Sequence, residues 1–305
     1  MNRFRKASMV VALAIAMTLV LAVPARAASP GRVYLDAADS FAVLAYSKVE
    51  NTGNSVVTGN LGLTPTAGSG ITGFYTPGVV NGTIYTVNAS GPTGYVENPA
   101  LLTSAKDAQT AAYLDAAGRT VDVVDMTGQD LGGKILPPGV YRFSSSAGLT
   151  GILTLDGTGY TNPVWIFQIG STLTTAAGAP NEPAARVVLA GGATPCDVFW
   201  QVGSSATIGT YSEFQGNILA LASVTMTTGA NLLGSAHALN GAVTLDDNDI
   251  TKGPCAVSPV PYTGTTPDKK GTLWNTAMLA GVFTVSILFA GLILFMVARR
   301  KRQTS

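Results

Sequence analysis

A strand-like segment occurs twice in this chain and limits the folds that are open to it. Val164–Ser171 reads VWIFQIGS, and Val198–Ser204 reads VFWQVGS, so that Gln168 in the first copy corresponds to Gln201 in the second. Recurrence of one strand type at a fixed interval indicates stacked structural units. The single repeated pair leaves two architectures open, a β-solenoid and a β-sandwich.

Short segments rich in β-branched residues alternate with turn residues through most of the chain. Val140–Phe143 follows a Pro-Pro-Gly turn, Ile152–Leu155 precedes Asp-Gly, and Ala242–Leu245 precedes Asp-Asp-Asn. Glycine, proline, asparagine and aspartate are the residues that tight turns require. Many short strands at close spacing predict a mostly β architecture.

One segment departs from this pattern, and its sequence predicts a helix at about residues 98–117. Asn98 is placed to cap its N-terminus, Pro99 suits the first helical position, and Gly118 follows its end. Its apolar side chains recur at helical spacing and are mostly alanine, at Leu101, Leu102, Ala105, Ala108, Ala112 and Ala116. Such a narrow face suits close packing against a sheet.

The N-terminal residues 1–27 have the features of a secretory signal peptide. Arg3, Arg5 and Lys6 precede an apolar segment, and the triplet Ala25-Arg26-Ala27 is a cleavage site of the A-x-A type. We therefore expect cleavage before Ala28 and export of the chain. The alternative is an uncleaved membrane anchor.

A second apolar segment covers residues 277–298 and predicts a transmembrane helix. It contains no charged residue, and its length is close to the roughly 20 residues that span a bilayer. The basic run Arg299–Arg302 opens a tail of residues 299–305, which the positive-inside rule places in the cytoplasm. The domain at residues 28–255 is then outside the cell.

The intervening linker, residues 256–276, contains the pentapeptide Val260, Pro261, Tyr262, Thr263, Gly264. This motif, followed by an apolar segment and a basic tail, resembles the LPxTG cell-wall sorting signal of Gram-positive bacteria, with Val in place of Leu. The resemblance implies that a sortase cuts between Thr263 and Gly264 and joins the protein to peptidoglycan. The alternative is a plain linker to a permanent membrane anchor. Either way, we expect a Gram-positive bacterium to hold this protein on its extracellular side.

Composition argues against several classes of function. Charged residues make up 11% of the chain and the net charge is +1, which gives no field for capturing nucleic acid. His237 is the only histidine, and we expect it to have a structural or surface role rather than to act as a catalytic base. Asp246–Asp249 offers oxygens to a metal ion such as Ca²⁺, but aspartate and asparagine after a strand more often form a turn. We expect no enzyme activity, cofactor, metal or small-molecule substrate.

Cys196 and Cys255 are the only cysteines, and both lie in the part predicted to be exported. An oxidising compartment favours a disulfide between them. Two reduced thiols are the alternative.

Long parts of the chain are similar to the bacterial ice-binding family. The similar segments, which together cover about residues 42–255, are Val56–Phe74, Leu131–Gly159, Asn162–Thr175, Asp197–Thr210, Gly216–Ala230 and Ala238–Ile250. The resemblance implies a right-handed discontinuous β-solenoid of triangular section, with one long α-helix alongside. It also implies that strands early in the sequence complete the stack beside late ones. One departure is Gly234–Ala238, which reads GSAHA where many relatives have GRALA.

Strand alternation sorts the side chains of these segments into inward and outward sets. Val224, Met226, Val243 and Leu245 are expected to point inward. The threonines expected to point outward, and to form a flat ice-binding face with Ser and Ala, are Thr172, Thr174, Thr207, Thr225, Thr227 and Thr244. The alternative for these threonines is an ordinary solvated β surface, since Thr favours strands in any case. The alternative function is a wall-anchored adhesin or structural surface protein that binds carbohydrate or other cells.

Overall fold

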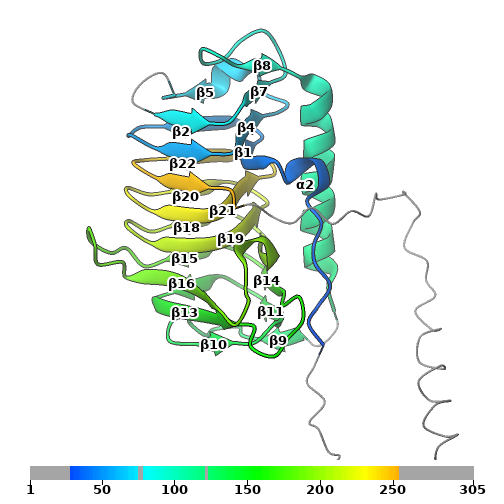
Figure 1. Cartoon of the computed structure of the whole chain (residues 1–305), viewed down its shortest axis with the longest axis vertical. Helices are drawn as coiled ribbons and strands as arrows, with labels where there is room; N and C mark the ends of the chain where they lie inside the picture. The colour runs from blue at the N-terminus through cyan, green and yellow to red at the C-terminus, as the bar shows by residue number, and fades with distance from the viewer. Residues whose placement is uncertain (1–27, 75–77, 121–122, 254–305) are drawn as a thin grey trace, which may run out of the picture. The chain divides into compact units, whose positions relative to one another are not determined.

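The computed structural model describes residues 28–74, 78–120 and 123–253 (Figure 1). The chain divides into two units, Met1–Cys255 and Ala256–Ser305, and every described residue belongs to the first. The predicted signal peptide, sorting motif, transmembrane segment and basic tail lie outside the described residues, as does Cys255. Within the described ranges, no helix has the length and apolar character needed to cross a bilayer.

The described part is mostly β, and its strands stack in three rows. Row A contains β8 (Val96–Glu97), β7 (Ile84–Thr86), β4 (Asn60–Leu63), β1 (Phe41–Ala45), β21 (Asn231–Ala238), β19 (Glu213–Ala220), β17 (Val198–Val202), β14 (Trp165–Ile169), β11 (Gly139–Phe143) and β9 (Val123–Asp125). Row B contains β12 (Ala147–Leu149), β15 (Leu173–Thr175), β18 (Ala206–Ile208), β20 (Val224–Met226), β22 (Ala242–Leu245), β2 (Lys48–Asn51) and β5 (Ile71–Thr72).

Row C contains β10 (Ile135–Leu136), β13 (Gly151–Asp156), β16 (Ala185–Ala190), the first halves of β19 and β21, β23 (Asp249–Thr251), β3 (Val56–Thr58) and β6 (Val79–Asn81). Neighbouring strands in the rows are parallel. Short 3-10 turns occur at Asp36–Ala38, Gly68–Gly70 and Pro195–Asp197.

Two long strands turn the corner between rows C and A. Glu213 of β19 pairs with row C, whereas Asn217 of the same strand pairs with Phe199 in row A. The bends fall at Gly216 and Gly234, whose φ angles of 112° and 149° favour glycine. The two glycines lie in register, so consecutive turns of the chain change direction at the same place.

The repeated segment settles the choice between solenoid and sandwich. β14 lies directly on β17, with Gln168 opposite Gln201 in a parallel pair, as stacked rungs of a solenoid require. The stack is also discontinuous in sequence. β1 pairs with β21 and β2 pairs with β22, so early strands lie beside late ones, as the family resemblance implies.

Among the described residues there is one α-helix, α2 (Pro99–Gly118), and it runs along row A (Figure 1). The backbone N–H of Leu101 donates to the Asn98 side chain over 3.0 Å, so Asn98 is the predicted N-cap. At the other end, the Gln168 amide donates to the carbonyls of Ala116 and Arg119 over 2.8 and 2.7 Å. The repeated glutamine therefore fixes the helix C-terminus to the sheet, and Gln201 likewise donates to the Tyr113 hydroxyl.

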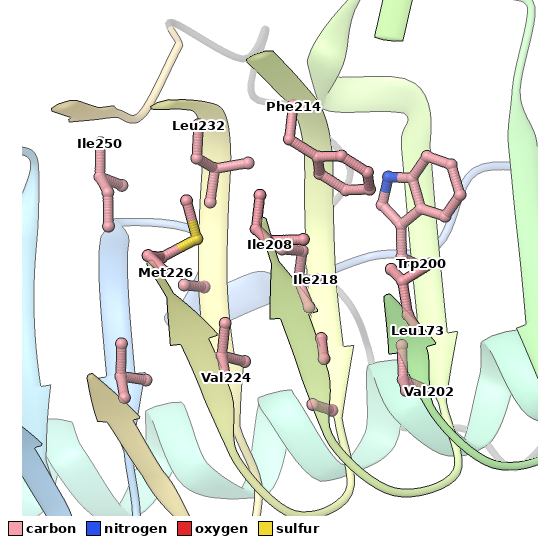
Figure 2. Close-up of a cluster of buried hydrophobic side chains, with 14 of the residues drawn as sticks. Leu173, Trp200, Val202, Ile208, Phe214, Ile218, Val224, Met226, Leu232 and Ile250 are labelled. Carbon is pink, nitrogen blue, oxygen red and sulfur yellow. The ribbon is translucent and has the colours of Figure 1, made fainter. Parts of the chain in front are cut away.

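The core has two layers because the middle strands of row A are buried on both sides. Inside the stack, Phe167, Trp200 and Phe214 follow one another with ring centroids 4.0 and 4.7 Å apart. Figure 2 shows Trp200 beside Phe214. Outside row A, residues such as Ile166 and Phe199 pack against the alanine-rich face of α2. Burial on both faces explains why β14 and β17 are apolar at every position except Gln168 and Gln201, rather than alternating.

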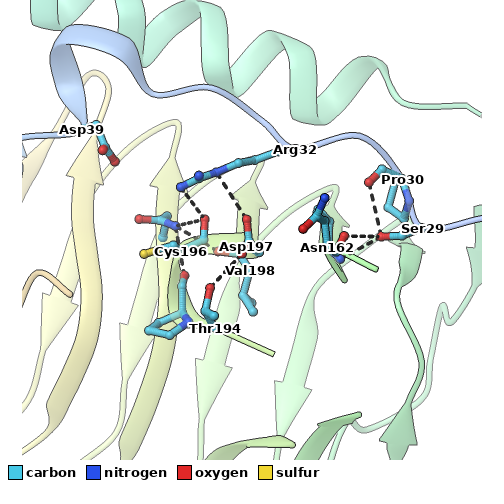
Figure 3. A network of polar contacts seen from close by, with 12 residues as sticks. Ser29, Pro30, Arg32, Asp39, Asn162, Thr194, Cys196, Asp197 and Val198 are labelled. Carbon is cyan, nitrogen blue, oxygen red and sulfur yellow. Dashed lines mark hydrogen bonds and ion pairs between the residues drawn. The ribbon is translucent and has the colours of Figure 1, made fainter. Parts of the chain in front are cut away.

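The N-terminal segment of the described residues is bound to the body of the solenoid (Figure 3). Ser29 Oγ accepts the backbone N–H of Val164 over 2.9 Å. Arg32 forms an ion pair with Asp197 at 3.3 Å and donates to the carbonyl of Cys196. Cys196 itself is 7% exposed and is not a free thiol, while its predicted partner Cys255 lies outside the described residues, so the pairing stays a prediction.

Candidate functional site

Four of the six candidate threonines form one straight file on the outer side of row B. Thr174 lies opposite Thr207, Thr207 opposite Thr225, and Thr225 opposite Thr244, on four successive parallel strands. We call these four residues the threonine file. Strands of one sheet are about 4.8 Å apart, so the file repeats its methyl and hydroxyl groups at that spacing.

The other two candidates lie beside the file rather than in it. Thr172 precedes Thr174 by two residues, and its hydroxyl donates to Ser146 Oγ over 2.8 Å. Here row B carries a second line of small residues, the flanking file, made of Ser146, Thr172, Ser205, Ser223 and Ala242. Thr227 lies on the opposite side of the threonine file.

The Thr227 hydroxyl is engaged within the protein. It donates to the carbonyl of Ile208 over 2.8 Å and lies 3.3 Å from the hydroxyl of Thr210. The sequence predicts Thr227 and Thr225 equally as residues of the ice-binding face, but in the structure the Thr227 hydroxyl is the one that bonds to the carbonyl of the preceding turn. Thr225 in the centre of the file is therefore the better position for probing the surface.

The core holds the threonine file in place from behind. The inward residues on either side of Thr225, Val224 and Met226, are fully buried (Figure 2). Val243 and Leu245 beside Thr244 are fully buried as well. This confirms the alternation predicted from the sequence. Because Thr is restricted at χ1 and its backbone is fixed by packing, the array has little freedom to change shape.

Row C has a different outer surface. Its strands carry Ile152, Arg186, Glu213 and Asp249 on the outside, and Arg186 forms an ion pair with Glu213 at 2.7 Å. Charged, polar and apolar side chains are mixed there, and the outward threonines in register are Thr251 and Thr58 on two strands. Row A is covered by α2, and of the two remaining rows of the described solenoid only row B repeats one residue type over four successive strands.

The side chains considered above as a catalytic base or as metal ligands have structural roles. His237 is fully buried, which confirms a structural role and corrects the surface alternative. Asp246 accepts hydrogen bonds from the hydroxyls of Thr52 and Thr228, and Asp247 accepts the backbone N–H of Asn54 over 2.6 Å, as expected of turn residues. Across the described ranges, no group of three or more His, Cys, Asp or Glu side chains is placed to hold a metal ion.

A surface hollow of about 530 Å³ lies at the end of the solenoid near β9. Its walls include Pro30, Arg119, Pro138, Tyr141 and Tyr160, and no acidic side chain lines it among the described residues. Tyr141 is almost completely buried and donates to the carbonyl of Pro137 over 2.6 Å. The hollow thus has a partly exposed aromatic ring in Tyr160, but among the described residues it lacks the acidic groups expected of a carbohydrate site.

Comparison with known proteins agrees with this geometry. The family model described as ice-binding-like matches residues 43–251. An ice-binding protein of a Nostoc species is 45% identical over 84% of this chain and 85% of its own length. One from Flavobacterium frigoris is 34% identical over 72% of this chain and 76% of its own.

Solved structures give the same result for the fold. The crystal structure of an ice-binding protein from an Antarctic biological consortium superposes with a TM-score of 0.65 at 39% identity, covering 75% of this chain and 95% of that one. A domain of ice-binding protein 1 from Shewanella frigidimarina superposes with a TM-score of 0.66 at 32% identity, covering 74% of this chain and all of that one.

Proposed function

The chain belongs to the ice-binding-like family, and from this premise we propose that it binds ice through row B, with the threonine file at the centre of the contact. The observation that carries the proposal is the register of Thr174, Thr207, Thr225 and Thr244 on four successive strands. Repeated hydroxyl and methyl groups at a fixed spacing are suited to holding water in an ordered layer. The protein acts by binding, without catalysis.

Row B suits a crystal surface better than a flexible carbohydrate or a protein partner. A crystal presents the same group many times, so a receptor gains from repeating its own groups in register. The threonine file runs along the row B strands β15, β18, β20 and β22, and the flanking file beside it begins one strand earlier, at Ser146 next to β12. Both files consist of small uncharged residues. An adhesin for carbohydrate would instead require a groove with both aromatic and acidic side chains, and no acidic side chain lines the described hollow.

A bulky residue in the middle of the threonine file tests the proposal. In Thr225→Tyr, the ring stands above the plane of its neighbours and holds an ice surface away from them. We expect this variant to lose most of the thermal hysteresis and of the inhibition of ice recrystallisation. Thr225→Val keeps the shape and a methyl group, and should retain much of both activities.

Thr154→Tyr is the matched control, because Thr154 lies on the outer side of β13 in row C. Both tyrosine variants change a partly exposed residue, so the free energy of unfolding should change by no more than about 0.5 kcal/mol. If Thr154→Tyr abolishes activity and Thr225→Tyr does not, the contact lies on row C. If the unaltered protein is folded but shows neither thermal hysteresis nor inhibition of ice recrystallisation, the ice-binding proposal is rejected and the adhesin is the remaining proposal.

We further propose that the protein is displayed on the cell surface of a Gram-positive bacterium. The support is the N-terminal signal peptide and the order of Val260–Gly264, apolar segment and basic tail in the sequence. If a sortase joins Thr263 to peptidoglycan, the protein stays in the wall fraction after detergent extraction, and Thr263→Ala shifts it to the membrane fraction. Complete detergent extraction of the unaltered protein would instead support a permanent membrane anchor.

A further inference from the structure

The line of outward residues in row B continues beyond the threonine file but changes character at one strand. Glu50 of β2 lies opposite Thr244, and Thr72 of β5 lies opposite Glu50. A single carboxylate therefore separates Thr72 from the four threonines of the file. Lys48 is on β2 as well, and it lies opposite Ala242 of the flanking file.

Lys48 and Glu50 form an ion pair across the two files. Their charged atoms are 2.8 Å apart, and their side chains remain 43% and 38% exposed. Both side chains are longer than the Thr, Ser and Ala side chains on the next four strands. An ammonium group is strongly hydrated, and its water shell does not follow the spacing of the threonine hydroxyls.

We propose that the Lys48–Glu50 ion pair is the boundary of the ice-contact surface, and that it confines contact to the row B strands β15, β18, β20 and β22 and excludes Thr72. The inference rests on the proposed function, since it concerns the extent of the same face. An ice surface that continued over β2 would have to strip water from two charges or rise above their side chains. The contact therefore ends where the uncharged array ends.

Removal of the pair should extend the contact. In the double variant Lys48→Ala with Glu50→Thr, small uncharged residues run without interruption from Thr174 to Thr72. The outward threonines in line increase from four to six. Because the contacts are individually weak and sum over the surface, we expect thermal hysteresis to rise by about half. An exposed ion pair contributes little to folding, so the variant should remain folded.

Arg186→Ala with Glu213→Thr is the matched control on row C. This pair is 2.7 Å apart with side chains 39% and 50% exposed, and its removal changes the same kinds of charge. Hysteresis should not change. An equal rise in both double variants would attribute the effect to charge in general and overturn the proposal.

Thr72→Tyr gives a second and independent readout. In the unaltered protein Thr72 lies outside the contact, so this change should leave hysteresis as it was. In the Lys48→Ala, Glu50→Thr background the same change should remove the gain. If Thr72→Tyr impairs the unaltered protein as strongly as Thr225→Tyr does, the boundary is refuted while ice binding by row B stands. Failure of row B as a whole is recognised separately, by full activity of Thr225→Tyr.

Discussion

His237 gives this protein a stability that depends on pH. The imidazole is fully buried on β21, its Nε2 lies 3.1 Å from the carbonyl oxygen of Phe41, and its Nδ1 is a buried atom without a hydrogen-bond partner. The pKa of His237 is lowered from its ordinary 6.5 to about 4, chiefly by burial and next by the positive charge of Lys252. The Phe41 carbonyl and Asp39 act in the opposite direction, and Lys106 adds a smaller lowering effect.

The sign of the effect follows from which state takes up the proton. Below pH 6.5 the unfolded chain protonates this histidine, whereas the folded protein resists until the pH approaches 4. The contribution of His237 to the free energy of unfolding is therefore complete above pH 6.5 and is lost as the pH falls to about 4. A shift of two to three units at 1.36 kcal/mol per unit corresponds to about 3 kcal/mol.

Urea denaturation at a series of pH values between 7 and 4 measures this directly. The free energy of unfolding should fall across that interval, and His237→Gln, which has no group that titrates there, should show a much smaller fall. Carboxylates contribute below about pH 5, so the comparison between the two proteins is sharpest from pH 6.5 to 5. Parallel curves for the two proteins over that range would refute the reasoning.

Two further predictions concern the backbone and the cysteines. Gly234→Ala should lower the free energy of unfolding by at least about 2 kcal/mol, because its φ of 149° excludes a side chain and the added Cβ would meet the carbonyl oxygen of Gly216. Gly118→Ala, where nothing lies within 4 Å of the added Cβ, is the control and should not destabilise the protein. Mass spectrometry of the exported protein without reduction should find Cys196 linked to Cys255, and two free thiols would contradict the predicted bond. The bond should contribute about 4 kcal/mol in the chain-entropy model.

Features that depend on neighbouring residues could be predicted from the sequence. The helix was bounded to within about one residue, because Asn98, Pro99 and Gly118 carry local signals for its ends. The inward positions of Val224, Met226, Val243 and Leu245 follow from alternation along a strand and are confirmed by their burial. The repeat indicated stacked units but left solenoid and sandwich open, and the structure places Gln168 opposite Gln201, because equal spacing in a solenoid brings equal positions into register.

Features that depend on distant segments could not be predicted in this way. His237 lies in a run of small residues that gives no sign of burial, and it is buried because row A is covered by a helix from another part of the chain. Gln109 on α2 is likewise buried in this layer, although its polarity suggested an exposed position. The roles of Thr225 and Thr227 differ through contacts made by Ile208 and Thr210 on the preceding turn.

The position of Glu50 shows why the extent of the candidate site is also a non-local property. All four residues of the threonine file come from one continuous stretch, residues 173–245, whereas Glu50 joins the line only because β2 pairs with β22 across most of the sequence. β2 lies one strand from the end of row B, where β5 is the last strand of the row among the described residues. Charged side chains near a sheet edge discourage unwanted pairing with other strands. Lys48 and Glu50, which interrupt the array, therefore have a reason to be charged that is independent of ice. If the double variant gains thermal hysteresis but also self-associates through the edge of row B, protection of the edge and ice contact make opposite demands on β2.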